Sequence, residues 1–365
     1  MRTIKNNSFL PNIPLLICSL LFVLIGIITI ATASPPFAIN EGLAPHYYLN
    51  HQLLFGFLPG IFLGALAFLI PLNLFKKYSF LFFVFSCLLM FSVLIPSVSI
   101  CEGGACRWVN FFGISLQSSE FLKITSILYL AALFSSEKIK KPLLNFFISM
   151  FFIFLAFNIQ SDLSTFVVVF ITAAAIFFTA NTKIKEVVLV GLGGLSLFLI
   201  MILIAPYRME RIMTLFNPLN DTLDDAYHIN QSLISIGSGG LNGSGLGLSA
   251  QKFGFIPESM SDSIFTIYAE ELGFLGCAFL ILLLIFFVIY VMQIAKKSNL
   301  FGKLLAIGIC TWIVSQSFVN MAAMTGLIPL TGIPLPFLSY GGTHLFVELI
   351  ALGLLLNVSR PVNNN

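Results

Sequence analysis

Residues 206–273 read PYRMERIMTLFNPLNDTLDDAYHINQSLISIGSGGLNGSGLGLSAQKFGFIPESMSDSIFTIYAEELG and interrupt an otherwise apolar chain. This stretch holds more than half of the 15 acidic residues, together with two arginines, a lysine and a histidine. Charged groups are costly inside a bilayer, so we expect the stretch to form a loop in water. Any chemistry of this protein is expected here, at the boundary between water and lipid.

The composition of the chain is that of an integral membrane protein with several spans. Of its 365 residues, 58% are hydrophobic and only 9% are charged, and the mean hydropathy is +1.01. Soluble domains carry about 25% charged residues. The net charge of +3 comes from basic residues spread between the apolar segments, so it does not indicate nucleic-acid binding. The 40 phenylalanines are interpreted as packing and lipid-facing side chains.

A helix needs about 20 mostly apolar residues to cross a bilayer. Ten segments qualify: 13–33, 53–75, 79–98, 119–136, 143–159, 163–180, 184–205, 267–294, 301–324 and 337–358. We predict an all-α polytopic membrane protein, with residues 1–365 as a single membrane domain. Residues 206–266 are then a large extracytoplasmic loop between transmembrane helices 7 and 8. The first segment ends like a signal peptide, but its apolar run is longer than a typical signal core, and we favour a retained helix.

Lysines and arginines predict the orientation of these helices. With a cytoplasmic amino terminus, 13 of the 18 basic residues fall in inside segments. This distribution agrees with the positive-inside rule. We therefore expect a multi-pass protein of the cytoplasmic (inner) membrane, with both termini in the cytoplasm and the long loop outside.

Four other segments are expected on the outer side, one of them a tight turn at residues 159–163. Residues 34–52 are predicted to be a polar connection. Residues 99–118 mix Arg107 and Trp108 with phenylalanines, which is typical of an interfacial amphipathic piece. Residues 325–342 are apolar but rich in Gly and Pro. Non-helical backbone near a bilayer must be buried in protein or line a cavity, so this segment is interpreted as a re-entrant or capping loop.

Two of the six cysteines, Cys101 and Cys106, are separated by four intervening residues in a polar segment. They are able to form a disulfide if that segment faces an oxidising compartment, although the spacing alone does not set the geometry. Neither a second cysteine pair nor a histidine pair is near them in the sequence, so they do not form a zinc site. The other four cysteines lie in apolar runs and are expected to be inert small hydrophobic residues.

Asp262 and Lys123 are the candidates for chemistry. Asp262 lies just before the eighth apolar segment, where a partly desolvated carboxylate acts as a base or, alternatively, interacts with a helix dipole. Lys123 lies one turn inside the fourth segment, and an intramembrane charge indicates function by default. Alternatively, Lys123 snorkels to the outer interface or pairs with Glu120 three residues earlier.

Arg107, Arg208 and Arg211 are outer basic residues that favour an anionic ligand such as a lipid diphosphate. The glycines between 237 and 247 lack the lysine and the strand–helix setting of a P-loop, so we interpret this run as a flexible, tightly turning loop. His344 and Glu348 are spaced to pair with each other on the last helix.

Several motifs together resemble the SEDS family (shape, elongation, division, sporulation). The resemblance covers nearly the whole chain and leans toward the FtsW and SpoVE branch over RodA. Its motifs are GGACRWVNFFGISLQSSEFLK at 103–123, IQSDLST at 159–165, the stretch from Arg211 to Phe274, GLIPLTGIPLPFLSYGGT at 326–343 and ALGLLLNVSR at 351–360.

The resemblance implies a ten-span peptidoglycan glycosyltransferase that polymerises lipid II with a class B penicillin-binding protein, among other divisome proteins. The family's essential aspartate falls on Asp262, and its intramembrane lysine falls on Lys123. Its arginines fall on Arg107 and Arg211. The substrate-binding residues are then Lys123, Arg107, Arg211, Glu258, Gln251 and Lys252. Family behaviour suggests a divalent cation, Mg²⁺ or Mn²⁺, although the sequence shows no dedicated metal site.

This chain departs from the family's pattern at a few positions. Cys106 stands where the family has a second arginine, Ser118 and Ser161 replace prolines, and the segment around Asp262 reads SDSIF. The departures affect diphosphate contacts near Arg107 more than the central chemistry. Two other functions stay open: a lipid II flippase, and a divisome scaffold with a degenerate site.

Overall fold

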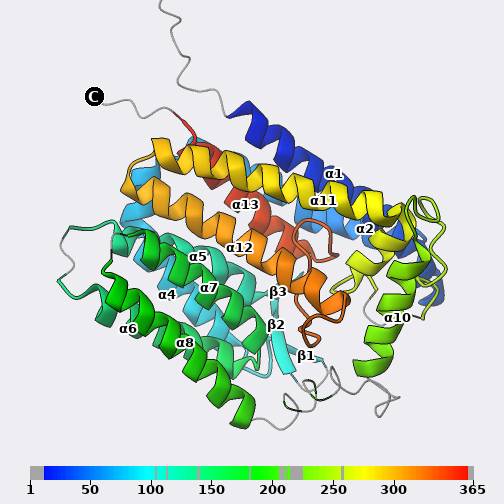
Figure 1. The fold of residues 1–365 in the computed structure, drawn as a ribbon, viewed down its shortest axis with the longest axis horizontal. Helices are drawn as coiled ribbons and strands as arrows, with labels where there is room; N and C mark the ends of the chain where they lie inside the picture. Colours follow the sequence, from blue (N-terminus) through cyan, green and yellow to red (C-terminus); the bar gives the residue numbers. More distant parts are fainter. Residues whose placement is uncertain are drawn as a thin grey trace, which may run out of the picture.

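The computed structural model describes residues 12–102, 105–111, 114–137, 140–180, 182–204, 225–255 and 259–360, together with residues 209, 211 and 213. Helices dominate this part of the chain (Figure 1). They are α1 (Ile13–Asn40), α2 (Tyr47–His51), the π-helix η1 (Gln52–Phe57), α3 (Leu58–Leu69), α4 (Leu72–Ser92), α5 (Ser118–Phe134), α6 (Pro142–Ile159), α7 (Leu163–Thr179), α8 (Ile184–Ile204), α10 (Asp225–Ser238), α11 (Ile264–Lys297), α12 (Leu300–Met324) and α13 (Gly342–Val358). The strands are β1 (Ser99–Glu102), β2 (Ala105–Phe111) and β3 (Ile114–Gln117).

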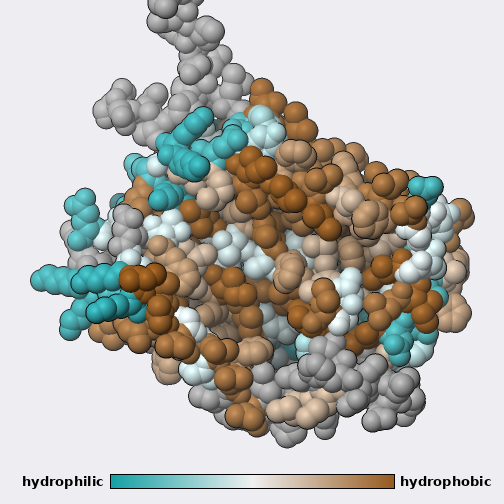
Figure 2. Space-filling view, in the orientation of Figure 1, coloured by the Kyte–Doolittle hydropathy of each residue, from teal (hydrophilic) through white to brown (hydrophobic). Residues whose placement is uncertain are grey.

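The protein is a polytopic helical membrane protein. Within the described residues, six helical segments are long and apolar enough to cross a bilayer: Ile13–Asn40, Tyr47–Leu69, Leu72–Ser92, Pro142–Ile159, Ile264–Lys297 and Leu300–Met324. The surface over the helices is largely hydrophobic, and hydrophilic side chains gather toward the ends (Figure 2). Each of the ten predicted segments contains a helix, while the number of crossings and the position of the termini stay predictions.

Two predicted boundaries are wrong. α1 continues to Asn40 through Pro35 and Pro36, so the start of the predicted 34–52 connection is helical. Packing accounts for this, because Ser34, Pro36 and Ala38 are buried in α1. The turn between α3 and α4 falls at Pro71 rather than after residue 75, since proline cannot continue the preceding helix.

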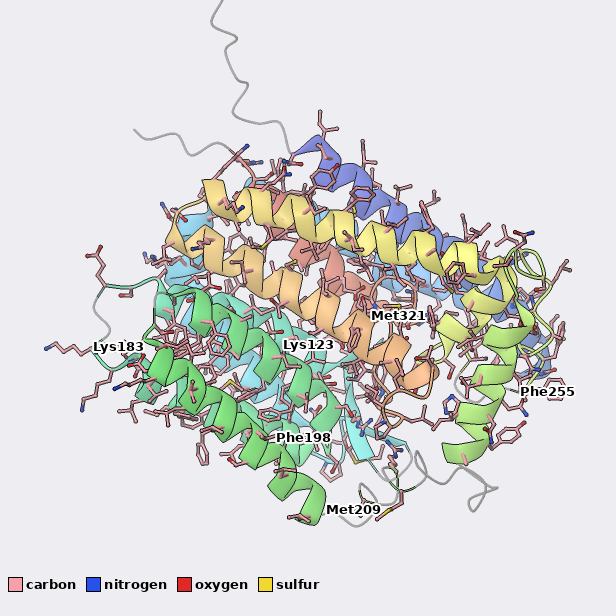
Figure 3. The ribbon with its side chains drawn as sticks, viewed as in Figure 1. Lys123, Lys183, Phe198, Met209, Phe255 and Met321 are labelled. Carbon is pink, nitrogen blue, oxygen red and sulfur yellow. A yellow bond between two sulfur atoms is a disulfide. The ribbon has the colours of Figure 1, made fainter. Side chains whose placement is uncertain are left out.

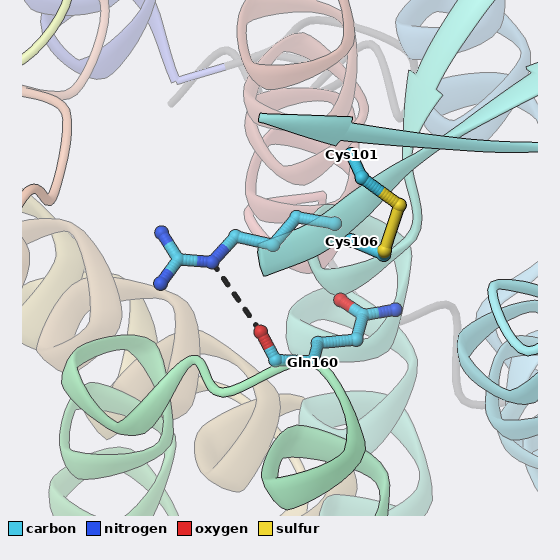
Figure 4. The surroundings of a disulfide bond; sticks show 4 residues. Cys101, Cys106 and Gln160 are labelled. Carbon is cyan, nitrogen blue, oxygen red and sulfur yellow. Dashed lines mark hydrogen bonds between the residues drawn. A yellow bond between two sulfur atoms is a disulfide. The ribbon is translucent and has the colours of Figure 1, made fainter. Parts of the chain in front are cut away.

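Residues 99–102, 105–111 and 114–117 form a small three-stranded antiparallel sheet in the order β1-β2-β3, so the prediction of an all-α protein is wrong here. The interfacial position of this segment stays a prediction. Gly103 and Gly104 separate β1 from β2 in the sequence, which is the composition of a hairpin connection. β3 runs directly into α5. A disulfide joins Cys101 on β1 to Cys106 on β2 (Figure 4), which settles the pairing that the spacing left open.

The glycine run is packed tightly against α11, contrary to the prediction of a flexible loop. Gly273 interrupts α11 with a φ of 64°. The amides of Phe274 and Leu275 that lose their helical acceptors donate instead to the carbonyls of Gly240 and Leu241, at 2.9 and 3.1 Å. A Cβ on Gly273 would overlap the backbone of residues 241–243. Glycine is therefore required for this contact.

The apolar segment between α12 and α13 has no regular structure, and much of it is buried. Its buried side chains are Leu330, Ile333, Leu335, Phe337, Leu338 and Ser339. This agrees with the predicted capping loop, because irregular backbone at membrane depth requires burial in protein. The segment lies at the same end of the bundle as the sheet, α10 and the start of α11 (Figure 1).

Candidate active site

Asp262 lies two residues before α11 and is half-buried. Its carbonyl oxygen accepts a hydrogen bond from Asn320 Nδ2 of α12 at 2.6 Å. Its carboxylate Oδ1 lies 3.3 Å from the Ser261 hydroxyl, which donates to it. On the other side, Ser263 Oγ pairs with His228 of α10 at 2.6 Å. The backbone that carries the carboxylate is thus held by two helices.

The segment before α13 holds Asp262 from a third direction. The amide of Tyr340 donates to Met260 O at 2.8 Å, and the hydroxyl of Ser339 donates to Ser261 O. The Tyr340 hydroxyl lies 2.9 Å from His51 Nδ1.

Lys123 lies inside the bundle rather than at the interface, so it does not snorkel. Its side chain is only 1% exposed, and Figure 3 shows it within the bundle, whereas Lys183 projects from one end. Nζ lies 2.8 Å from Glu120 Oε1 and donates to Gln316 Oε1 at 3.0 Å. It also lies 5.0 Å from the ring centroid of Trp312. The predicted Glu120 pairing is confirmed.

Glu120 connects Lys123 to the last helix. Its Oε2 lies 2.9 Å from His344 Nδ1, and His344 Nε2 lies 2.8 Å from Glu348 Oε1, so the predicted His344–Glu348 pairing is also confirmed. Glu348 Oε2 accepts from the amide of Phe337 at 2.9 Å. Buried charges are tolerated when they are paired, and here one paired network joins α5, α13 and the segment before α13.

Lys123 and Asp262 are tied to one stretch of backbone through a single face of α12. Gln316, which accepts from Lys123, donates to Pro334 O at 2.9 Å. Asn320, one turn further along, donates to Ile333 O at 2.8 Å and to Asp262 O. Residues four apart lie on the same side of a helix, about 6 Å apart along its axis. The backbone of Asp262 and the ammonium of Lys123 are therefore both linked to residues 333–334 through α12.

Arg107 lies on β2 beside the turn at residues 160–162. Its Nε donates to Gln160 O at 3.4 Å (Figure 4), and its Nη2 donates to Ser161 O at 3.1 Å. The side-chain amide of Gln160 donates to the hydroxyl of Ser118, the first residue of α5, at 2.6 Å. Arg107 is thereby connected to the helix that carries Lys123.

The other predicted substrate-binding residues have different surroundings. Arg211 Nη1 donates to Leu330 O at 3.2 Å, on the same irregular segment that faces Asp262. Lys252 is buried, and its three donors have three acceptors: Thr32 O at 3.0 Å, Gly247 O at 2.6 Å and Glu271 Oε1 at 3.3 Å. This arrangement ties the loop to α1 and α11.

The structure gives less support to three residues predicted to bind the substrate or an anionic ligand: Gln251, Glu258 and Arg208. Gln251 is half-buried, and within the described part of the chain no hydrogen-bond donor reaches its Oε1. Glu258 and Arg208 lie outside the described residues. No group of three or more His, Cys, Asp or Glu side chains suited to a metal ion occurs among the residues searched, which are the described ones.

Sequence reasoning missed Gln316, Asn320 and Glu270. The first two are polar residues one turn apart in an apolar helix, and that pattern is a usable signal. Glu270 accepts from Ser235 Oγ, Ser249 Oγ and the amide of Ala250, at 2.9, 2.6 and 2.9 Å. Glu270 thereby binds α10 and residues 249–250 to the start of α11. These contacts join residues 20 to 35 positions apart, so no local sequence pattern indicates them.

Comparison with known proteins identifies relatives along the whole chain. A family model described as Cell cycle protein, for FtsW, RodA and SpoVE, matches residues 13–364. Stage V sporulation protein E of Bacillus subtilis (strain 168) is 39% identical, over 98% of this chain and 99% of that protein. The probable peptidoglycan glycosyltransferase FtsW of Coxiella burnetii is 34% identical, over 96% of both. That of Aliivibrio salmonicida is 33% identical, over 92% of this chain and 86% of that protein.

Two solved structures have the same fold. One is a chain of a peptidoglycan synthase complex, from work on the structural coordination of polymerization and crosslinking, with a TM-score of 0.79 and 22% identity over 96% of this chain and 98% of that chain. The other is the rod shape determining protein RodA of Thermus thermophilus, with a TM-score of 0.69 and 23% identity over 96% of this chain and 97% of that one. With the family model spanning nearly all of the sequence, this chain belongs to the FtsW, RodA and SpoVE family.

Proposed function

We propose that this protein is a peptidoglycan glycosyltransferase that polymerises lipid II into β-1,4-linked glycan at the outer face of the cytoplasmic membrane, for septal wall synthesis in cell division. Relatives named probable peptidoglycan glycosyltransferase FtsW match most of the chain at 33–34% identity. The observation that supports the proposal is that the backbone of Asp262 and the ammonium of Lys123 are both linked to residues 333–334 through α12.

In this mechanism Asp262 is the general base. Its carboxylate takes the proton from the C4 hydroxyl of the acceptor lipid II, a contribution of about 10²–10⁴ in rate. The C4 oxygen then attacks the anomeric carbon of the growing glycan. A new C–O bond forms as the bond to the undecaprenyl diphosphate breaks, and inversion converts the α-linkage to a β-linkage. The leaving group carries away the electron pair of the broken bond.

In this proposal Arg107 and Arg211 stabilise charge on the leaving diphosphate. A guanidinium has five donors, and the contacts given above for Arg107 engage two of its nitrogens with carbonyls. Preorganised cations of this kind favour the transition state, where charge develops. A Mg²⁺ or Mn²⁺ ion bound mainly by the diphosphate would supply further charge there. Mg²⁺ is bound by one or two carboxylates together with phosphate oxygens, so the diphosphate itself would supply most of its ligands.

Lys123 is proposed to act mainly by positioning. Glu120 lies 2.8 Å from its ammonium and offsets its charge, which weakens its field at a diphosphate. Its bond to Gln316 instead fixes the amide that holds Pro334. Direct contact between Lys123 and the diphosphate remains a prediction.

A class B penicillin-binding protein is the proposed partner, supplying the transpeptidase. This rests on the similarity to a chain of a complex that coordinates polymerization and crosslinking. Both termini are proposed to be cytoplasmic, with the Asp262 end of the bundle outside, where lipid II is polymerised.

The test is a gel of glycan chains made from labelled lipid II by the purified protein, with and without the candidate partner. Wild type should give polymer, and Asp262→Asn should give none while it stays folded and bound to the partner. Polymer from Asp262→Asn removes that residue from the role of base. Lipid II transport into vesicles without polymer would favour a flippase, and complementation by Asp262→Ala would favour a scaffold.

A further inference from the structure

Arg107 is the extra residue of a β-bulge. Along the β1–β2 pair, Ile100 faces Trp108 and Cys101 faces Cys106, so the register shifts between Ile100 and Cys101. Arg107 lies between the two partners on β2 and has no partner on β1. A bulge bends its strand and re-aims a side chain, and bulges are frequent next to active sites.

The disulfide lies directly beside this bulge. Cys106 immediately precedes Arg107, and its bonded partner Cys101 begins the shifted part of β1. A slip of one residue in a strand pair moves every side chain to the opposite face. A covalent bond between Cys101 and Cys106 excludes such a slip, because it keeps these two residues opposite each other.

The position of Arg107 matters because its guanidinium reaches the 160–161 turn. Its Nε and Nη2 donate to the carbonyls of Gln160 and Ser161 at 3.4 and 3.1 Å. The side-chain amide of Gln160 in turn donates to Ser118 Oγ at the start of α5. β1 has only four residues and lies at the edge of the sheet, where β2 is its one neighbouring strand. Without the disulfide, the register of β1 on β2 would therefore depend on this short ladder.

We propose that the Cys101–Cys106 disulfide is a positioning element for the polymerisation reaction: it locks the bulged register that aims Arg107 at the diphosphate site. The inference rests on the proposed function. The bond forms when the two thiols give two electrons and two protons to a thiol–disulfide oxidoreductase on the outer side. Reduction by dithiothreitol reverses it, giving two thiols and oxidised dithiothreitol. Cys101 is exposed, so a reductant has access.

The experiment compares initial rates of lipid II polymerisation for the full-length protein with its partner. Cys101→Ser/Cys106→Ser, and wild type reduced with dithiothreitol, should each lose about tenfold in kcat/KM, mostly through KM, because a misplaced binding group weakens substrate binding. Cys87→Ser, which removes a free, half-buried cysteine on α4, should match wild type and should keep its sensitivity to dithiothreitol.

A double-mutant cycle separates positioning from folding. Arg107→Lys keeps the charge but not the forked donors, so it should lose activity by itself and lose little more when the cysteines are also replaced. The inference is overturned if the losses from Arg107→Lys and from the cysteine replacements multiply in the combined variant. It is also overturned if kcat/KM is the same with and without the disulfide. If the serine variant fails to fold, the test relies on wild type alone. The folded protein is reduced, mass spectrometry verifies the reduction, and the loss in kcat/KM decides. Absence of polymer from oxidised wild type would instead count against the proposed function.

Discussion

Asn320 donates its side-chain amide to the carbonyl oxygens of both Asp262 and Ile333, at 2.6 and 2.8 Å. One buried amide on α12 therefore sets the spacing between the candidate base and the irregular segment in front of α13. Loss of this donor leaves two carbonyls without a partner from α12, so the backbone of Asp262 loses one of the hydrogen bonds that hold it.

Asn320→Ala should lower kcat for lipid II polymerisation about ten- to 100-fold, because a small displacement of a catalytic group is costly. Its free energy of unfolding should fall by about 1–3 kcal/mol. Thr325→Ala, at the C-cap of α12, is the matched control, since among the described residues Thr325 Oγ1 donates to the carbonyls of Met321 and Ala322 in α12 and not to the segment that carries Asp262. Equal kcat values for the two variants would contradict the assignment of Asn320 as a positioning residue.

Lys123→Met should destabilise the protein by about 3–5 kcal/mol, since it leaves Glu120 buried without its lysine partner. Lys123→Met/Glu120→Gln should be less destabilised than the sum of the single variants, because it removes both charges of the pair. Thermal unfolding in detergent measures this coupling. Additive losses would mean that the 2.8 Å ion pair is not energetically coupled.

Gly273→Ala and Gly243→Ala should each cost about 2–3 kcal/mol of unfolding free energy, because both residues have positive φ and a Cβ on either would overlap backbone atoms. Gly237→Ala is the control: no atom lies within 4 Å of its added Cβ, and alanine favours the helix by up to about 1 kcal/mol. Similar stability of all three variants would rule out the tight contact between the glycine run and α11.

Lys252→Met tests whether this lysine binds substrate or ties the loop to the helices. Its ammonium has three oxygen acceptors within 3.3 Å, including the Glu271 carboxylate, so stability should fall by about 3–5 kcal/mol. The KM for lipid II should stay within about twofold at a temperature where the variant is folded. A raised KM with unchanged stability would support the substrate-binding role predicted from the sequence.

Hydropathy predicted where the apolar helices lie, because a helix in lipid forms its backbone hydrogen bonds within one continuous segment. It also singled out Asp262 and Lys123, since charges near apolar segments stand out. The β1–β2–β3 sheet was missed because strands of four to seven residues leave a weak pattern beside long apolar runs. The hydrogen bonds of Gln316 and Asn320 connect Lys123, Asp262 and residues 333–334, which are far apart in the sequence. No local sequence pattern predicts these contacts.

At the interruption of α11 by Gly273, the glycine run is bonded to the helix on both sides of the break. Before the break, the carbonyls of Glu270 and Glu271 accept from the amides of Ser244 and Gly245, and after it the amides of Phe274 and Leu275 donate to Gly240 and Leu241. The helix then continues among the membrane helices, as in the contact of Phe287 with Phe22 of α1. A displacement of the glycine run would therefore move the turn at Asp262 and the membrane part of α11 together rather than separately.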